Sequence, residues 1–460
     1  MTRPSPLRLA LAAAALALGS LALYAAGLDG VPFHPDESTY LFMSRDFATA
    51  FLEGQPARLA WTPGAPLTPE SRYRLLDGPA QRYLVGLGWW LAGERAADLN
   101  ADWDWRQSWA TNVAGGALPR PELLHAGRTP AAVLGALTAV LLLGLGAVLR
   151  GPGLGLVAGG LLLLHPLMLL HARRAMAEGP LLFASALTIL AGLALARLAD
   201  RTTPPGWRRL TGSAAGLGAA FGLALAVKAS ALALVPALAG VVGLAFGQAR
   251  WPGRQRLGAL MGAGLIAGAA ATLVFLALSP VLWRAPRLGL ETALALRTAL
   301  VREQTSALGE FAPQLLLPGA AERLRAAVTA LTVQTPAAWD VAVADQVAQL
   351  APQVDAYLAA PLQHGSLWAG AGLAGLATAG LAFSALRLGR DRCGPATRGE
   401  QAVWAWAAAT LAFTLWAVPF DWQRYFLPLL PPLCLFAALG LDGLAAPLLR
   451  RLPPLSRAQL

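Results

Sequence analysis

Long apolar runs alternate with short polar, arginine-rich junctions from one end of the chain to the other. A membrane-spanning helix needs roughly 20 mostly apolar residues. Ten runs meet that measure, at residues 8–27, 128–149, 152–171, 179–198, 211–227, 229–247, 258–281, 366–387, 401–418 and 424–447. In lipid such runs must be helical, because no water is present to hydrogen-bond the backbone. The pattern predicts an all-α, polytopic integral membrane protein with about ten transmembrane helices.

The first run also resembles a secretory signal peptide, since "AAGLDG" offers a weak cleavage site. Nine further runs favour the alternative, a retained membrane anchor. Composition agrees with a membrane protein, because 56% of the 460 residues are hydrophobic and only 13% are charged. A soluble protein of this size would not carry so much apolar sequence.

Arginines of the short loops gather on one side of the predicted bundle. They are Arg150, Arg197, Arg201, Arg208, Arg209, Arg250, Arg254, Arg256, Arg387, Arg390, Arg392, Arg398, Arg450 and Arg451. By the positive-inside rule that side is the cytoplasm, and both termini lie there. The net charge of +11 is then mostly a topology signal, and the sequence has no clustered basic face of the kind that binds nucleic acid. We expect a multi-pass protein of the cytoplasmic membrane.

Two long stretches, 28–127 and 282–365, fall on the opposite, extracytoplasmic side. In the first, "PAQRYLVGLGWWLA" at 79–92 is too short to span and fits a helix lying in the membrane interface. The second has helical patches near 287–304 and 319–332, and we expect both loops to form ordered lids. The predicted organisation is a catalytic core of residues 1–281 that includes the first loop, a loop or lid at 282–365, and C-terminal transmembrane helices at 366–460.

Directly after the first apolar run, "FHPDEST" sets Asp36 and Glu37 side by side. Pro35 suits the first turn of a helix, because it lacks the donor that would be unsatisfied there. Apolar residues then recur at helical spacing at Tyr40, Met43, Phe47 and Phe51. The pair therefore lies in the first turn of a short amphipathic helix, where one interpretation is simple stabilisation by the helix dipole, worth roughly 0.3–1 kcal/mol for each acid.

Three further polar clusters are predicted on the same face. They are His171, Arg173, Arg174 and Glu178 of "HARRAMAEGP", Lys228 between two apolar runs, and Asp421, Arg424 and Tyr425 of "DWQRYFLPLLPP". Ionisable residues near apolar spans are expensive and usually functional. Acids and cations on one membrane face fit the displacement of a lipid-linked phosphate from a carbon centre. A carboxylate can take the proton of an incoming hydroxyl, and Arg, Lys or a divalent cation can stabilise the leaving phosphate.

Structural interpretations of the same residues stay open. Arg173 and Arg174 can snorkel among lipid headgroups, and Glu178 can form an ion pair with one of them. Arg424 and Tyr425 can be interface anchors. His34 is either a metal ligand or a surface hydrogen-bonding residue. The tryptophans of "DWDWRQSW", at 103, 105 and 109, can stack on a sugar or anchor the loop in the interface.

The acidic pair after the first helix, "R-x-x-x-x-E" at the exit of the third, and "RYFLPLLPP" in the last helices together resemble the C-type glycosyltransferase superfamily. The branch that "HPDEST" matches is the protein O-mannosyltransferase and aminoarabinose-transferase type. The resemblance implies a donor sugar on a polyprenyl phosphate, an active site on the outer face, and Asp36 as catalytic base or acceptor-positioning group with Glu37 beside it. Many relatives have Asp where this chain has Glu178, which leaves the role of that acid open.

Aminoarabinose transferases also carry an acid, one residue and a proline before an interfacial helix, where the acid can bind a metal. "LDGPAQRY" offers Asp77 at that place. The resemblance therefore implies a possible divalent metal ion held by Asp36 and Asp77. The expected substrate-binding set is Tyr40, Arg173, Arg174, Glu178, Lys228, Arg424 and Tyr425.

Lys228 is the only lysine among 36 basic residues. A cation at a helix centre costs roughly 2.5–3.5 kcal/mol on insertion scales, and less near the interface. It either marks a helix end or contacts a phosphate, for which a compact ammonium suits a tight site better than a guanidinium. Relatives in the resembled family often have Lys at this junction, which favours phosphate contact.

The sequence therefore predicts a membrane glycosyltransferase that moves a sugar from a polyprenyl-phosphate donor to a hydroxyl of a glycan, lipid or protein on the outer face. The competing hypotheses are a transporter or flippase of a lipid-linked envelope precursor and a non-catalytic scaffold. A transporter should have polar residues near the midplane of its path. Here they gather outside, which favours the enzyme.

Overall fold

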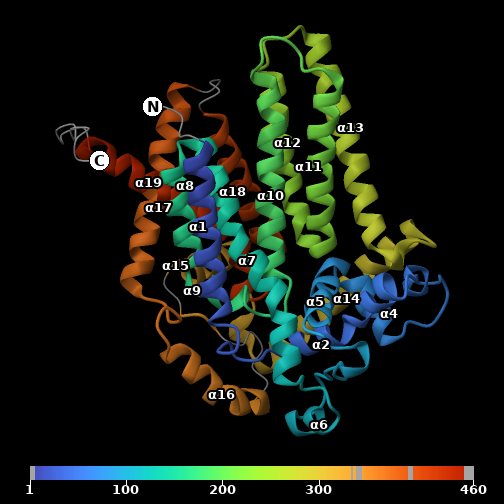
Figure 1. The fold of residues 1–460 in the computed structure, drawn as a ribbon. Coiled ribbons are helices and arrows are strands. Elements are labelled where there is room, and N and C mark those ends of the chain that lie inside the picture. The colour runs from blue at the N-terminus through green and yellow to red at the C-terminus, as the bar shows by residue number, and fades with distance from the viewer. Residues whose placement is uncertain (1–5, 333–334, 338–343, 392–396, 450–460) are drawn as a thin grey trace.

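The computed structural model describes residues 6–332, 335–337, 344–391 and 397–449. Within those ranges the regular structure is helical, apart from one isolated antiparallel bridge between Leu316 and Phe420. Figure 1 shows a bundle of long helices with shorter helices gathered at one end. We call that end, which bears α2 (Pro35–Met43), the loop face.

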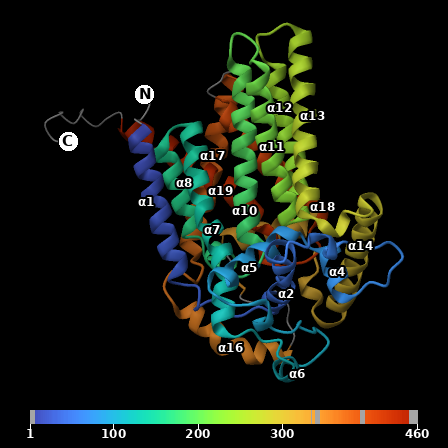
Figure 2. The ribbon, with the colours of Figure 1, turned by 45° about the vertical axis from the view of Figure 1, so that its right-hand side comes forward.

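The long helices run between the loop face and the opposite end of the bundle, side by side in Figures 1 and 2. They are α1 (Pro6–Ala25), α7 (Pro121–Leu149), α8 (Pro152–Leu163), α10 (Glu178–Ala196), α11 (Trp207–Val227), α12 (Leu234–Gly247), α13 (Gly253–Leu278), α17 (Leu367–Arg390), α18 (Arg398–Ala417) and α19 (Leu430–Leu449). Each of the ten predicted spans overlaps one of these helices, but the third, 152–171, is interrupted, because α8 ends at Leu163 and a separate short helix, α9 (Pro166–His171), follows. The predicted all-α fold is confirmed.

Seven helical segments of the described chain are long and apolar enough to cross a membrane: Pro121–Leu149, Glu178–Asp200, Trp207–Val227, Ala229–Gly247, Gly253–Leu278, Leu367–Arg390 and Gln423–Ala446. Two more apolar helices are shorter, at Leu9–Ala25 and Pro152–Leu163. The ninth predicted span is helical as α18 but is not among the seven. The chain is a multi-pass integral membrane protein.

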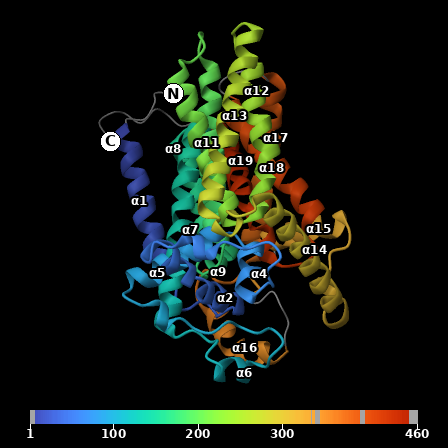
Figure 3. The same cartoon turned by 90° about the vertical axis from the view of Figure 1, so that its right-hand side faces the viewer.

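The remaining helices, most of them short, form the loop face, and Figure 3 shows them beneath the bundle. They are α3 (Arg45–Phe47), α4 (Pro69–Leu76), α5 (Pro79–Leu91), α6 (Trp109–Ala114), α9 (Pro166–His171), α14 (Pro286–Phe311), α15 (Ala320–Thr332) and α16 (Ala344–Ala359), with the 3₁₀ turns η5 (Ala229–Ala233) and η8 (Gln423–Leu429) at the ends of long helices. The helix predicted at 79–92 is α5, and the patches predicted near 287–304 and 319–332 are α14 and α15. Proline in the first turn begins many of these helices, where its missing N–H has no helical partner to lose.

Close helix crossings depend on glycine. A Cβ atom on Gly380 of α17 would overlap the carbonyl oxygen of Phe436 in α19, and one on Gly440 would overlap that of Leu376. In lipid, where the solvent is as apolar as the side chains, such small-residue contacts are a main source of helix association. These crossings hold α19, and with it η8, against α17.

Topology can be tested by labelling of single cysteines introduced at exposed positions. Thr305 lies on α14 of the loop face, and Thr203 lies in the turn before α11 at the other end; both are exposed. With the loop face outside, a membrane-impermeant thiol reagent should label Thr305→Cys in intact cells and Thr203→Cys only after permeabilisation. The reverse pattern would contradict the predicted orientation.

Candidate active site

The first turn of α2 fixes the acidic pair. His34 is the N-cap: its Nδ1 accepts a hydrogen bond from the backbone N–H of Asp36 at 3.1 Å, and the Glu37 carboxylate accepts one from the N–H of His34 at 3.0 Å. This reciprocal arrangement is a capping box, with Pro35 in the first turn. It directs Glu37 into the protein, where it is 0% exposed, and leaves the Asp36 side chain 30% exposed.

Glu37 forms a buried ion pair with Arg128 of α7. The guanidinium donates from Nε and Nη2 to the two carboxylate oxygens, each at 2.8 Å, and from Nη1 to the carbonyl oxygens of Leu28 and Val31. The backbone N–H of Ala175 donates to the same carboxylate at 2.8 Å. Glu37 thereby ties together α2, α7 and two loops. The sequence analysis did not single out Arg128, although a charge at the start of an apolar run is a signal for a partner.

Asp36 lies on the other side of the turn, against Arg424 of η8. Nη1 of Arg424 donates to its Oδ2 at 2.7 Å, across 388 residues of sequence. The Arg424 guanidinium also lies 5.2 Å from the ring centroid of Trp422 and 5.7 Å from that of Tyr425, within cation–π range. The structure thus brings together the acid after the first helix and the cation before the last.

Lys228 and Glu178 form a second ion pair at the same place. Nζ of Lys228 donates to Oε1 of Glu178 at 2.9 Å, and it lies 5.4 Å from the Tyr425 ring. Lys228 has an extended backbone between α11 and η5, so its side chain leaves at a break in the helix. Glu178 therefore has this lysine as an ion-pair partner.

The two adjacent arginines have different surroundings. Arg173 donates to the carbonyl oxygen of Leu23 at 2.8 Å, and its guanidinium lies 5.3 Å from the Tyr24 ring, so it closes the end of α1. Arg174 is fully buried and donates to the carbonyl oxygen of Pro32 at 3.4 Å. Arg174 is therefore the arginine of the pair that lies on the side of α2.

His34 is held in its neutral form. Burial, followed by the positive charges of Arg174 and Arg424, lowers the pKa of His34 well below its usual value. Since its Nδ1 accepts the N–H of Asp36, the ring hydrogen lies on Nε2. Both guanidinium groups lie close to the start of α2, since Arg424 donates to Asp36 and Arg174 donates to the carbonyl oxygen of Pro32.

Tyr40 lies among the acids of the site. Burial raises the pKa of its hydroxyl well above the usual value, and the negative charges of Asp77, Glu178 and Asp36 raise it further, while Arg424 lowers it. These groups come from α2, from the turn before α5, from the start of α10 and from η8. One tyrosine therefore identifies the point at which four separate segments meet.

Asp77 is held by contacts on both sides of the α4–α5 turn. Nη2 of Arg297 in α14 lies 3.5 Å from its carboxylate, and Nη2 of Arg82 donates to its carbonyl oxygen at 2.7 Å. The next residue, Gly78, packs so tightly that a Cβ atom would overlap the carbonyl oxygen of Val227. Because Val227 directly precedes the lysine, the turn lies beside the Lys228–Glu178 pair.

A buried acid that the sequence analysis missed supports this turn. Asp46 of α3 is 2% exposed and accepts from Nε and Nη2 of Arg74 at 2.9 and 2.7 Å. Its Oδ2 also lies 3.4 Å from Nη1 of Arg82. Asp46 therefore orients the same arginine that holds Asp77 in place.

The structure brings most of the predicted set together, namely Asp36, Tyr40, Asp77, Arg174, Glu178, Lys228, Arg424 and Tyr425, with Glu37 behind them. A divalent metal is less well accommodated. In the described part of the chain no three His, Cys, Asp or Glu side chains cluster closely enough to hold an ion. Each predicted ligand instead faces a cation, Asp36 facing Arg424 and Asp77 facing Arg297. The carboxylates therefore do not form a ready-made metal site.

The tryptophans of the first loop have unequal positions. Trp103 is buried and packs with Trp109 and Phe33, with ring centroids 5.3 and 5.8 Å away. Trp105 is partly exposed and meets the ring of His34 edge-on at 6.3 Å. Trp103 and Trp109 therefore pack in the core of the loop face, whereas Trp105 borders the site.

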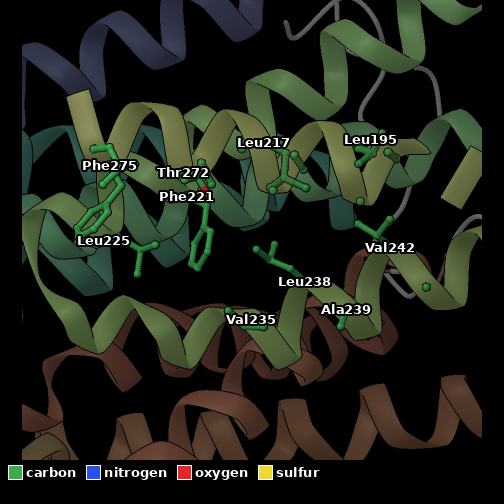
Figure 4. Close-up of a pocket in the computed structure, with 18 of the residues that line it drawn as sticks. Leu195, Leu217, Phe221, Leu225, Val235, Leu238, Ala239, Val242, Thr272 and Phe275 are labelled. Carbon is green, nitrogen blue, oxygen red and sulfur yellow. The ribbon is translucent and has the colours of Figure 1, made fainter. Parts of the chain in front are cut away.

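An apolar cavity of about 900 Å³ runs between α10, α11, α12 and α13 (Figure 4). Its wall includes Leu217, Phe221, Leu225, Leu238, Val242 and Phe275. Arg287 and Glu291 of α14 line the end nearest the loop face. Leu225 lies three residues before Lys228, so the cavity and the charged cluster share the last turn of α11.

Comparison with known proteins finds a family model that matches part of the chain. Residues 69–285 match the family model of the dolichyl-phosphate-mannose-protein mannosyltransferases. No curated protein matches the sequence. Among solved structures, the archaeal oligosaccharyltransferase AglB from Archaeoglobus fulgidus, in complex with an inhibitory peptide and a dolichol-phosphate, is similar at a TM-score of 0.51 and 14% identity, over 95% of this chain and 51% of that one.

ArnT from Cupriavidus metallidurans, bound to undecaprenyl phosphate, is similar at a TM-score of 0.50 and 16% identity, over 97% of this chain and 61% of that one. This chain thus spans about half to three-fifths of the length of these proteins, and at such identities the likeness concerns the fold. The fold of this chain is thus that of these two membrane proteins, and its residues 69–285 match the model of the dolichyl-phosphate-mannose-protein mannosyltransferase family, in keeping with the resemblance noted in the sequence.

Proposed function

We propose that this protein transfers a sugar from a polyprenyl-phosphate donor to a hydroxyl group of an acceptor, on the extracytoplasmic face of the cytoplasmic membrane. The observation that carries the proposal is the meeting of the partly exposed Asp36 with Arg424, Lys228 and Glu178 at one end of a membrane bundle. The family match and the fold of two polyprenyl-phosphate-bound relatives support it. The acceptor is a glycan, lipid or protein.

Asp36 is the proposed base. One of its oxygens accepts from Arg424, which leaves the other for the proton of the acceptor hydroxyl. The acceptor oxygen bonds to the anomeric carbon as the bond from that carbon to the phosphate oxygen breaks, which inverts the configuration. The polyprenyl phosphate leaves with the bonding electrons, and Arg174, Arg424 and Lys228 stabilise its charge.

The other acids have supporting roles in this proposal. Both oxygens of Glu37 are occupied by Arg128 and by backbone N–H groups, so Glu37 positions Asp36 rather than taking a proton. Glu178 holds Lys228. Tyr40 and Tyr425 line the space between these charges, and Arg173 acts through the end of α1.

The apolar cavity suits the donor's chain. A polyprenyl phosphate has a hydrocarbon tail, which stays in the bilayer core, and a charged head, which stays at the interface. The cavity has an apolar wall through the bundle, and this wall includes Leu225, three residues before Lys228. A donor with its tail in the cavity could therefore place its phosphate near the lysine. A flippase would need polar groups along the path across the bilayer, and in the described residues the cavity wall is apolar apart from Thr272 and the end at α14.

The base assignment predicts a large loss of rate from the replacement of one heavy atom. Asp36→Asn keeps the shape but removes proton acceptance, so transfer should fall by about 10²- to 10⁴-fold. Asp29→Asn, an exposed acid on the same loop, is the matched control and should transfer normally. The measurement is sugar transfer from a polyprenyl-phosphate donor by purified protein. Near-normal transfer by a folded Asp36→Asn protein would contradict the base assignment and indicate that Asp36 only stabilises the start of α2.

Lys228 is proposed to contact the donor's phosphate. Lys228→Arg keeps the charge but not the compact ammonium, and should recover transfer only in part. Removing the lysine alone leaves Glu178 buried without its partner, which threatens folding. The double variant Lys228→Met with Glu178→Gln avoids that charge and should lose about 10²-fold in turnover. Arg284→Ala, an exposed cation of the same face, is the control. Full activity in both Lys228 variants would make the lysine a helix-end anchor.

The metal hypothesis is tested separately, since no step above passes through an ion. If Asp36 and Asp77 hold a divalent cation together with the donor's phosphate, a chelator should abolish transfer. Asp77→Asn should then raise the metal concentration needed for half-maximal activity, and Glu310→Gln, an exposed acid of α14, should leave it unchanged. Transfer that is indifferent to chelator would exclude the ion and leave Asp77 as a structural partner of Arg297.

A further inference from the structure

One histidine caps the start of the short helix α9 and another is its last residue, and within the described residues only the first has hydrogen-bond partners for its ring. His165 caps the start of α9: its Nδ1 accepts from the N–H of Leu167 at 3.3 Å, and its Nε2 lies 2.9 Å from the carbonyl oxygen of Leu331. His171 ends α9 and is 0% exposed. Neither of its ring nitrogens has a hydrogen-bond partner in the described part of the chain. Burial without partners is unusual for a polar side chain and calls for an explanation.

The surroundings of His171 are those of the proposed active site. Its electrostatic neighbours are Arg174, Glu178, Arg424 and His34. Oε2 of Glu178 is likewise buried without a hydrogen-bond partner, while Oε1 is held by Lys228. Unmatched polar atoms from α9 and α10 therefore lie in one interior region, next to the start of α2.

The charges of that region indicate what the imidazole can bind. Arg174, Arg424 and Lys228 supply three positive groups, against the carboxylates of Asp36 and Glu178. An imidazole carries at least one N–H in every protonation state, so it can always donate one hydrogen bond. A donor buried beside several cations suits an anion with oxygen acceptors, and a phosphate has them.

We propose that His171 is a phosphate-binding residue: its ring N–H donates a hydrogen bond to an oxygen of the lipid donor's phosphate group, beside Arg174. This rests on the proposed function and extends it to a residue outside the predicted site set. His171 contributes a neutral donor where the other phosphate contacts are charged. It holds the phosphate before and after the sugar leaves, so the leaving polyprenyl phosphate should depend on it as much as the intact donor.

Substitutions can separate hydrogen bonding from packing. His171→Gln and His171→Asn each keep an N–H donor at about the reach of one ring nitrogen. His171→Phe and His171→Leu keep apolar volume but donate nothing. The readout is binding of undecaprenyl phosphate to the purified protein in nanodiscs of zwitterionic lipid, with thermal unfolding measured alongside. His165→Gln, at the other end of α9, is the matched control.

If His171 donates to the phosphate, the Phe and Leu variants should bind about 10- to 100-fold more weakly. At least one of the Gln and Asn variants should recover most of that loss, and His165→Gln should bind normally. Unchanged binding by folded Phe or Leu variants would overturn the proposal and make His171 a packing residue or the ligand of a buried water. Equal loss in all four variants would also overturn it, because the donor would then not matter.

The same assay distinguishes this inference from the proposed function. Arg174→Ala and the Lys228→Met, Glu178→Gln double variant should weaken undecaprenyl phosphate binding whether or not His171 takes part. If these weaken binding and His171→Phe does not, the His171 proposal alone fails. If wild-type protein does not bind undecaprenyl phosphate at all, the proposed function fails with it.

Discussion

The buried ion pair between Glu37 and Arg128 is the contact on which the rest of the site depends. Each guanidinium nitrogen is engaged: Nε and Nη2 with the carboxylate, and Nη1 with two carbonyl oxygens of the loop after α1. Taking two charges out of water is expensive, and such a pair is favourable only when its remaining donors and acceptors are also satisfied. Removing one partner of a buried pair typically costs about 3–5 kcal/mol. In the Glu37–Arg128 pair the remaining donors and acceptors are satisfied, so the pair fixes α2 against α7 and the loop before α10.

That constraint separates the roles of two adjacent acids. Both carboxylate oxygens of Glu37 are hydrogen-bonded to Arg128 and to backbone N–H groups. Asp36 is therefore the partly exposed carboxylate of the pair, and Arg424 fixes its direction. Asp46 likewise supports the site without facing it: it orients Arg82, and Arg82 donates to the backbone carbonyl oxygen of Asp77. Asp36, the proposed reacting group, therefore makes few hydrogen bonds, whereas the acids that position the site, Glu37 and Asp46, each make several.

Much of this arrangement follows from the sequence, because lipid leaves an apolar run little choice but a helix. Counting spans then decides which junctions share a face, and so Asp36, Lys228 and Arg424 were expected together despite their separation in the chain. Counting spans could not predict which side chains form hydrogen bonds or ion pairs with one another. Arg173 and Arg174 look equivalent in sequence, but one closes α1 and the other is buried beside Pro32. Arg128 and Asp46 were missed because their partners lie on other elements, and only packing brings them within reach.

The position of the charged cluster along the bundle has a physical reason of its own. Charges in the hydrocarbon core are costly, whereas at its edge they retain access to water and headgroups. An amphiphile with a phosphate head has the same preference, so a protein that handles one should have apolar walls that end in cations. Here α11 is apolar along the cavity and then breaks at Lys228, whose extended backbone turns its side chain toward Glu178 and Tyr425. If α11 continued unbroken through Lys228, the helical period alone would fix the direction of the side chain at that position. The break therefore lets one helix contribute both the apolar wall and the cation at its end.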